Sequence, residues 1–147
     1  MSSDRFHLIG AVYILLVRNG KVFLTRRKNT GWSDGSYSLV GGHLDGNETA
    51  REAATREAME EAGVKVEIED LEFVNASHLL TNNERIHFSF VTEKWEGEPH
   101  NNEPEKASEA EWFSLDALPK DLTENSLRTI ECYKNGTTYS EFGWTKK

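Results

Sequence analysis

Residues 41–64 constrain the fold of this chain more than any other stretch of its sequence. Thr49 and Glu52 have the spacing of a helix capping box, in which each side chain accepts a hydrogen bond from the other residue's backbone amide. The alanines and long side chains that follow favour helix. Gly63 stands where helices commonly end, because glycine readily adopts the left-handed conformation of that position. We therefore predict a helix from about Thr49 to Ala62.

Three glutamates concentrate negative charge on this helix. Glu57, Glu60 and Glu61 stand at i, i+3 and i+4, so a regular helix holds their carboxylates within about 100° of arc. Each like-charge pair costs about 0.2 to 0.5 kcal/mol on an exposed helix. A solvated face with salt bridges to Arg56 tolerates that cost, whereas a divalent cation removes it. Because Mg²⁺ and Mn²⁺ prefer oxygen ligands and Mg²⁺ often shares its coordination with substrate phosphates, the cluster indicates phosphate chemistry.

The rest of the chain is predicted to form strands and one more helix. Apolar and β-branched runs predict strands at residues 8–17, 22–27, 37–40, 64–77, 86–95 and 111–115. Asn19-Gly20 predicts a hairpin turn between the first two strands, and the third is expected to stop at Gly41-Gly42. Residues 86–95 alternate apolar with other side chains and predict one buried face. Residues 96–108 predict an exposed loop, either solvent filler or a functional flap, and residues 126–134 predict a terminal helix.

Length and composition limit the class of protein. The 147 residues fit a single domain spanning residues 1–147. A formal net charge of -8 repels a phosphate backbone, so no DNA or RNA polymer is expected as a partner. Cys132, the only cysteine, excludes a disulfide framework and a cysteine-based zinc site. No apolar run reaches the roughly 20 residues of a membrane span and no signal peptide is recognisable, so we expect a cytoplasmic protein without a membrane partner.

Seven residues of the acidic segment match the spacing of a known motif: Gly42, Glu48, Arg56, Glu57, Glu60, Glu61 and Gly63, followed by aliphatic Val64. This pattern resembles the Nudix box, in which glycine, glutamate, Arg-Glu, Glu-Glu, glycine and an aliphatic residue recur at these intervals. The resemblance extends to residues 24–27, 95–99 and 111–113, which are similar to the small nucleotide-cleaving branch that includes antimutator enzymes acting on 8-oxo-dGTP. Val40, where many relatives carry proline, and the small Ala58 are departures that remove no ligand.

The resemblance implies a fold and a metal site. The fold is a Nudix-type α/β/α sandwich with a mixed β-sheet, the box helix on one side and the terminal helix on the other. Glu57, Glu60 and Glu61 are expected to bind Mg²⁺, or Mn²⁺, together with a backbone carbonyl of Gly41 or Gly42. Glu57 or Glu60 is the expected general base.

Other residues receive roles by the same resemblance. Arg56 is expected to orient the adjacent carboxylates with Glu48, the alternative being a plain helix salt bridge. Gly63 closes the box helix. Glu105, in the late loop, is the candidate for a further metal ligand and the second candidate for the general base. Glu103 is the close alternative, and a solvated loop without a role in the site is the other one.

Substrate-binding candidates flank the box. Arg26 and Arg27 follow a strand where antimutator relatives place an arginine near the nucleotide, and strand alternation lets only one of them face the site. His43 lies at the mouth of the expected site. The other histidines show no metal spacing and are expected to be structural or exposed. Four aromatic residues could stack a base or belong to the core, and the sequence does not select among them: Trp32, Tyr37, Phe88 and Trp144.

The activity that the resemblance implies is Mg²⁺-dependent hydrolysis of a phosphoanhydride in a nucleoside diphosphate-linked substrate. The first candidate is a (d)NTP, including oxidised ones, cleaved to NMP and pyrophosphate. Alternatives are nucleotide sugars, dinucleotides, ADP-ribose or capped RNA ends, and a catalytically silent nucleotide-sensing module. An isomerase built on the same box is disfavoured because Cys132 lies too late in the chain for the required reactive cysteine. Dimers are common among relatives, which leaves a homodimer open.

Overall fold

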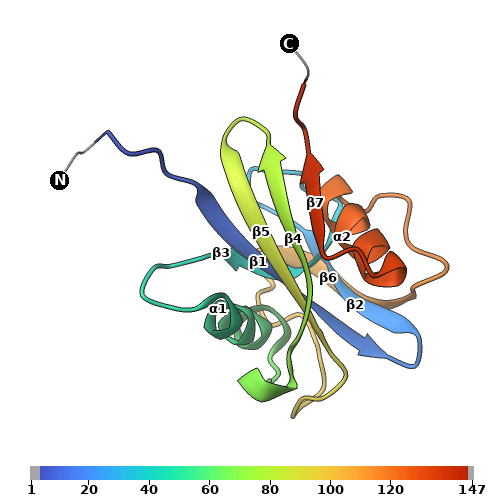
Figure 1. Ribbon diagram of the computed structural model, residues 1–147. Coiled ribbons are helices and arrows are strands. Elements are labelled where there is room, and N and C mark those ends of the chain that lie inside the picture. Colours follow the sequence, from blue (N-terminus) through green and yellow to red (C-terminus); the bar gives the residue numbers. More distant parts are fainter. Residues whose placement is uncertain (1–3, 146–147) are drawn as a thin grey trace.

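A mixed seven-stranded sheet forms the middle layer of the structure, a computed structural model that describes residues 4–145 (Figure 1). The strand order is β6-β2-β3-β1-β5-β4-β7, with β1–β5 and β4–β7 parallel and the other pairs antiparallel. The strands are β1 (Ile9–Arg18), β2 (Lys21–Arg27), β3 (Tyr37–His43), β4 (Glu72–Leu80), β5 (Glu84–Thr92), β6 (Ala107–Ser114) and β7 (Tyr139–Phe142).

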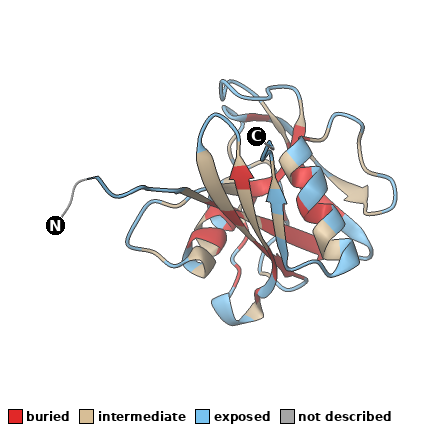
Figure 2. Ribbon diagram, turned by 45° about the horizontal axis from the view of Figure 1, so that its top comes forward, coloured by how far each residue is buried: buried red, intermediate tan, exposed pale blue. Residues whose placement is uncertain are grey.

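One helix covers each face of this sheet (Figures 1 and 2). Helix α1 (Ala50–Glu57) continues into a π-helical turn, η1 (Ala58–Ala62), and its alanines pack with Val12, Ile14 and Phe90. Helix α2 (Glu124–Asn135) places Ile130 against the opposite face. A short 3-10 turn, η2 (Ile68–Asp70), precedes β4. The predicted α/β/α sandwich with a mixed sheet is therefore confirmed.

Local signals in the sequence account for the well-predicted elements. Asn19 and Gly20 both have positive φ, as a two-residue hairpin turn requires, and Arg18 pairs with Lys21 across it. Thr49 caps α1 with the complete capping box to Glu52. Gly63 adopts the left-handed conformation at the end of η1.

Three strand predictions need correction. The predicted strand at 64–77 begins only at Glu72, because Lys65 makes an isolated bridge to Glu96 and η2 follows. The last predicted strand starts earlier, at Ala107, and β7 was not predicted. Strand β3 does not stop at the glycines but runs through them to His43, since both pair with β1.

The expectation of one buried face on β5 is also wrong. His87 and Ser89 are buried together with Phe90 and Val91, because helix α2 covers the side of the sheet that alternation assigned to solvent. A strand with helices on both faces loses the simple two-residue alternation.

Strand β3 changes partners halfway along its length, and this opens space beside it. Its first residues pair with β2 and its later residues with β1. Where the ladder to β1 is missing, the start of α2 supplies partners: the Leu39 amide donates to Ser126 Oγ at 2.9 Å, and the Thr123 amide donates to the Tyr37 carbonyl at 2.9 Å. The polar residues at the N-terminus of α2 are therefore held beside the middle of β3.

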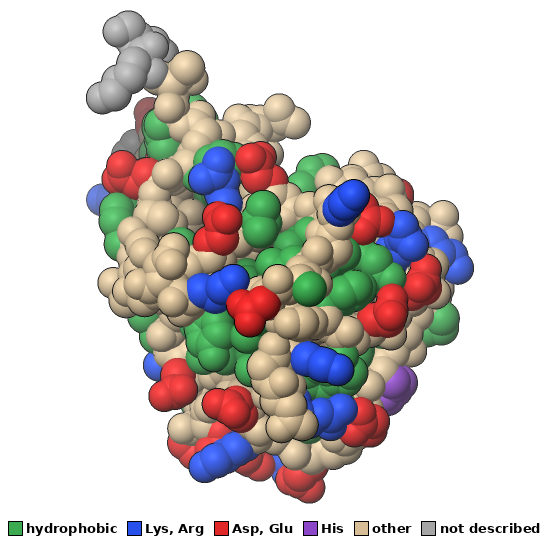
Figure 3. Space-filling model, turned by 90° about the vertical axis from the view of Figure 1, so that its right-hand side faces the viewer, with side chains coloured by type: hydrophobic (Ala, Val, Ile, Leu, Met, Phe, Trp, Pro, Cys, Tyr) green, Lys and Arg blue, Asp and Glu red, His purple; other side chains and the backbone are tan. Residues whose placement is uncertain are grey.

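Charged side chains of both signs are mixed over the surface. On the face that Figure 3 shows, lysines and arginines lie among aspartates and glutamates and form no continuous basic surface. Exposed pairs such as Arg18–Glu98 and Lys134–Asp116 contribute to this mixing. Within residues 4–145, no helix combines the length and the apolar character that a bilayer crossing demands.

The alanines of α1 allow the helix to approach the sheet closely, and enlarging one of them should destabilise the fold. Ala54 is fully buried. Ala54→Leu is expected to lower the free energy of unfolding by about 1 to 3 kcal/mol, because a packed core has no room for three further carbons. Urea denaturation followed by circular dichroism measures the change. Ala117→Leu, at an exposed alanine, is the matched control and should shift it by less than about 0.5 kcal/mol; equal effects would contradict close packing of α1.

Candidate functional site

The end of helix α1 widens into the π-helical turn η1, which separates the environments of the three box glutamates. Glu57 is the last α-helical residue and is only 7% exposed, whereas Glu60 and Glu61 lie within η1. The regular helix predicted through Ala62 is therefore wrong in its last turn. Such wide turns recur at functional sites because they redirect side chains without ending the helix. Here all three glutamates line one pocket, but they meet different partners.

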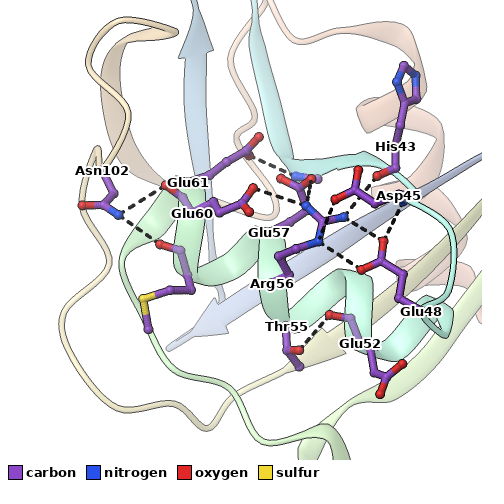
Figure 4. Close-up of polar contacts among 12 residues, drawn as sticks. His43, Asp45, Glu48, Glu52, Thr55, Arg56, Glu57, Glu60, Glu61 and Asn102 are labelled. Atoms are coloured by element: carbon purple, nitrogen blue, oxygen red, sulfur yellow. Dashed lines mark hydrogen bonds and ion pairs between the residues drawn. The ribbon is translucent and has the colours of Figure 1, made fainter.

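Arg56 lies at the centre of the acidic residues (Figure 4). Its guanidinium donates two hydrogen bonds to Glu48, at 3.1 and 2.9 Å, one to Glu57 at 3.0 Å and one to Glu60 at 3.3 Å. The His43 carbonyl accepts a further bond at 3.2 Å. Arg56 therefore holds Glu57 and Glu60 in place while Glu48 fixes Arg56 from the other side, so it does more than pair with one neighbour. The orienting role in catalysis stays a prediction.

Glu61 turns away from Arg56 toward strand β3. Its Oε1 accepts a hydrogen bond from the Gly41 amide at 3.1 Å, as the close-up shows (Figure 4). Burial, reinforced by the charge of Glu57, raises the pKa of Glu61 well above its usual range. Burial also raises the pKa of Glu57, although Arg56 opposes this. The fold thus holds two carboxylates where negative charge is unfavourable.

The two glycines of β3 let these carboxylates lie against the strand. A Cβ on Gly42 would lie 2.8 Å from Glu57 Cδ, so the Glu57 carboxylate would have to move away from the strand. A Cβ on Gly41 would lie 2.7 Å from the Tyr13 ring and against the Val12 carbonyl. Close approach, rather than backbone freedom, is therefore what requires glycine here, and both glycines line the pocket.

The late loop is a structural part of the site and not solvent filler. Asn102 donates from Nδ2 to the carbonyls of Met59 and Glu60 at 3.0 and 3.3 Å, and its amide donates to the Glu61 carbonyl at 3.1 Å (Figure 4). Carbonyls at the end of a helix lack the usual partners within the helix, and Asn102 supplies donors to them; the Met59 carbonyl also accepts from the Gly63 amide at 3.0 Å. Sequence analysis did not single out Asn102, since its role depends on a contact across about forty residues.

The same loop brings Glu103, and not Glu105, to the pocket. Glu103 lines the pocket, and its charge helps to raise the pKa values of Glu57 and Glu61. Glu105 is exposed and is not among the lining residues. The structure therefore places Glu103, the alternative to Glu105, in the pocket, and the identity of the late-loop ligand stays a prediction.

The pocket beside β3 has a volume of about 800 Å³ and receives residues from most elements of the fold. The glutamates of α1 and η1 line it together with basic residues of other segments: Arg27 of β2, Arg85 of β5 and Lys106 of the late loop. Within residues 4–145, neither Arg27 nor Arg85 forms an ion pair with a carboxylate, unlike Arg18, Arg26, Arg56 and Arg128. The pocket thus combines unpaired cations with crowded anions.

The predicted substrate-binding residues separate clearly in the structure. Arg27 lines the pocket, whereas Arg26 lies away from it, paired with Glu109 at 3.1 Å and with Asp121 at 2.5 Å. Arg26 is therefore not placed for substrate binding, and strand alternation explains why only one of the two faces the pocket. His43 lines the pocket, and its Nε2 lies 3.1 Å from Arg85 Nη1.

Several pocket residues were not identified from the sequence. Arg85, His87 and Asn125 line it because β5 runs parallel to β1 and α2 begins beside β3. His87 is buried and, within the described chain, has the one buried side-chain polar atom without a hydrogen-bond partner, Nε2. Burial lowers its pKa to about 4, so it is neutral at physiological pH. The strand register and the packing of α2 against the sheet, rather than any local signal in the sequence, determine these positions.

The acidic residues fit a hard divalent cation in their chemistry. Glu57, Glu60, Glu61 and Glu103 offer carboxylate oxygens that face one pocket, and Gly42 leaves room for the Glu57 carboxylate. Among the described residues, however, no three acidic, histidine or cysteine side chains lie close enough together to hold a metal as they stand, because Arg56 and the Gly41 amide draw the carboxylates apart. The donor set fits Mg²⁺; side-chain rotations would be needed to gather it.

Comparison with known proteins gives a family match. The NUDIX domain model matches residues 7–132. The chain is 31% identical over 115 residues to the 8-oxo-dGTP diphosphatase of Escherichia coli, covering 76% of this chain and 83% of that protein. It is 32% identical over 144 residues to the ADP-ribose pyrophosphatase of Methanocaldococcus jannaschii, covering 90% and 79%.

A third relative is longer than this chain. The NAD-capped RNA hydrolase NudC of Pseudomonas aeruginosa is 32% identical over 119 residues, which cover 80% of this chain but only 40% of NudC. Among solved structures, the MutT NUDIX hydrolase of Burkholderia pseudomallei superposes with a TM-score of 0.78 at 26% identity, covering 86% of this chain and 98% of that one.

The raised pKa of Glu61 predicts how stability depends on pH in the presence of a chelator. A carboxyl whose folded pKa lies above its unfolded value stabilises the fold at low pH, and that stability is lost as pH rises through the folded pKa. In EDTA, Glu61 should therefore lower the unfolding free energy of the wild type as the pH rises from about 5 to about 8, whereas buried His87, with its pKa lowered to about 4, acts in the opposite direction in the wild type and the variant alike. Glu61→Gln, which keeps the acceptor for the Gly41 amide, should therefore gain stability relative to the wild type over this range.

Urea denaturation at both pH values measures this difference. Glu60→Gln is the matched control, because Glu60 is exposed in the same turn and should change the pH dependence less. A Glu61→Gln variant that gains no stability relative to the wild type over this range would contradict the burial of charge at this position.

Proposed function

The chain belongs to the NUDIX family, and from this premise we propose that it hydrolyses (d)NTPs, including oxidised ones, to NMP and pyrophosphate with Mg²⁺. The broader activity follows from the family and its relatives: the protein is a pyrophosphohydrolase acting on acid anhydrides of nucleotides. The main support for the proposal is the charge arrangement of the pocket, where Glu57 and Glu61 lie in one cavity with Arg27 and Arg85. A polyphosphate that carries its own cations is complementary to both sets of charges.

The proposed metal site consists of Glu57, Glu60 and Glu61, with Glu103 as the late-loop ligand and a carbonyl of Gly41 or Gly42. When bound, Mg²⁺ neutralises the anhydride oxygens and increases the acidity of a bound water. At an effective dielectric constant near 20, two unit charges about 4 Å apart interact by roughly 4 kcal/mol, so carboxylates and phosphates exclude one another unless a cation is shared.

The side chains of this chain then position and activate the reactants. A water oxygen forms a bond to a phosphorus atom, the bridging P–O bond breaks, and the leaving phosphate keeps the electron pair. Glu60 is our candidate for the base that accepts the water proton, because it lines the pocket and 47% of its side chain is exposed, whereas Glu57 is buried against Gly42. Arg56 acts as a positioning residue: it holds Glu57 and Glu60 by hydrogen bonds and is itself held by Glu48.

The substrate class rests on the relatives together with the pocket. The E. coli protein is named for 8-oxo-dGTP, while the other two relatives are named for ADP-ribose and NAD-capped RNA. ADP-ribose, nucleotide sugars and dinucleotides are therefore the second candidates, and a silent sensing module is a third that the complete set of glutamates disfavours. We propose a cytoplasmic enzyme acting on small nucleotides, without a nucleic-acid polymer as partner; a homodimer rests on analogy alone.

A substrate screen distinguishes these candidates. With Mg²⁺, nucleoside triphosphates should be cleaved to NMP and pyrophosphate with kcat/KM about 10-fold or more above that for ADP-ribose, a nucleotide sugar and a dinucleotide. Anion chromatography of the products separates pyrophosphate from phosphate release. Turnover of the conjugates alone would overturn the (d)NTP assignment while leaving pyrophosphohydrolase activity intact.

Metal removal and substitution of the glutamates test the site itself. EDTA should abolish turnover and excess Mg²⁺ should restore it. Glu57→Gln should lower kcat/KM by about 100-fold or more, and Glu103→Gln by about 10-fold to 100-fold, because each removes a charged ligand or its support. Glu105→Gln is the matched control in the same loop and should stay within about 2-fold of the wild type, since Glu105 lies off the pocket. A larger loss of kcat/KM in Glu105→Gln than in Glu103→Gln would instead support Glu105 as the late-loop ligand.

A further inference from the structure

Trp32 is an aromatic residue exposed at the pocket. It lies in the loop between β2 and β3, lines the pocket and is 48% exposed. Of the large hydrophobic side chains that are exposed in residues 4–145, it alone lines the pocket. An exposed indole gains from contact with another flat apolar surface, which removes both from water.

Arg27 fixes the indole from one side. Its guanidinium carbon lies 4.8 Å from the centre of the Trp32 ring, and its Nε donates to the Trp32 carbonyl at 2.7 Å. Arg27 Nη2 also donates to Thr30 Oγ1 at 2.8 Å, and Thr30 bonds to Asp34 at 2.6 Å. Two of the nitrogens of Arg27 are therefore engaged in holding the loop, and the ring is presented to the pocket in a defined orientation.

The other aromatic candidates are excluded by their positions. Tyr37 is buried under Arg26 and bonded to Glu111, outside the pocket. Trp144 packs on His78 and Phe88 packs against the core, and both lie outside the pocket. Tyr13 lines the pocket, but its ring is engaged edge-on with His87. Trp32 is thus the aromatic side chain of the described chain with the most exposed surface available to a ligand there.

We propose that Trp32 is the stacking platform for the base of the nucleotide, and that Arg27 is a positioning residue that holds the platform. This inference rests on the proposed function, because it takes the ligand to be a nucleotide. A stacking contact accepts every base, since each has a π-face, and it favours the larger purines. Arg27 then contributes to substrate binding through Trp32 and the loop as well as through its charge.

Steady-state kinetics separate stacking from a general effect on the site. Trp32→Ala and Trp32→Leu should each raise KM for a purine nucleoside triphosphate by about 10-fold with kcat nearly unchanged, and Trp32→Phe should stay within about 3-fold of the wild type. Inhibition by inorganic tripolyphosphate, which has no base, should be the same in all four proteins. A KM that does not rise in Trp32→Ala, or an equal loss of tripolyphosphate inhibition, would overturn the proposal.

Fluorescence gives a readout that does not require turnover. Binding of a nucleotide with a methylene group between the α and β phosphorus atoms, in the presence of Mg²⁺, should quench tryptophan emission in the wild type and in Trp144→Phe. The quench should be lost in Trp32→Phe and reduced in Arg27→Lys, which keeps the charge but not the donor geometry. Trp144→Phe is the matched control because Trp144 is similarly exposed, at 45%, and lies off the pocket.

The two proposals fail in different ways. A quench that depends on Trp32 without any hydrolysis would refute the proposed activity and support the platform. Normal hydrolysis with a quench that survives in Trp32→Phe would refute the platform and leave the activity in place.

Discussion

The burial of Glu57 and the partial burial of Glu61 against strand β3 form the constraint on which the rest of the site depends. Two carboxylates in a poorly hydrated space repel one another and raise each other's pKa. Arg56 compensates Glu57, whereas Glu61 accepts a hydrogen bond from the Gly41 amide and is further stabilised by the charge of Arg27. The raised pKa values show that these contacts do not offset the cost of the two charges, and the proposed Mg²⁺ would relieve it.

The neighbouring structure can be understood as the set of conditions that make this burial possible. Gly42 gives the Glu57 carboxylate its space, and the buried alanines bring α1 close enough to the sheet for contact. The π-helical turn directs Glu61 inward, and Asn102 satisfies the carbonyls of that turn. These features lie in different elements, and they act on the same cost, because a buried charge or carbonyl without a partner is unfavourable.

The sequence predicted those parts of this arrangement that depend on local rules. The capping box, the hairpin turn, Gly63 and the helical placement of the glutamates follow from neighbours a few residues apart. The π-helical turn did not, because helix propensities do not distinguish it from an α-turn. Arg85, Asn102 and Asn125 were missed since their positions depend on strand register and on loop contacts distant in sequence, and the same long-range contacts place Glu103 rather than Glu105 in the pocket.

The residues that local sequence signals predict are those proposed to act in hydrolysis, whereas the residues that only long-range contacts place are those proposed to recognise the substrate. The motif residues lie in one continuous segment and supply the acidic side of the pocket, which acts on the anhydride common to all substrates of such enzymes. The opposite side comes from the β2–β3 loop, the start of β5 and the start of α2, none of which the motif specifies. Relatives that share the motif but are named for different nucleotides are then expected to differ on this second side. In this chain, Arg27 interacts with both sets of residues. Its charge lowers the pKa of Glu61, against the effect of burial, and its nitrogens donate hydrogen bonds to the loop that carries Trp32.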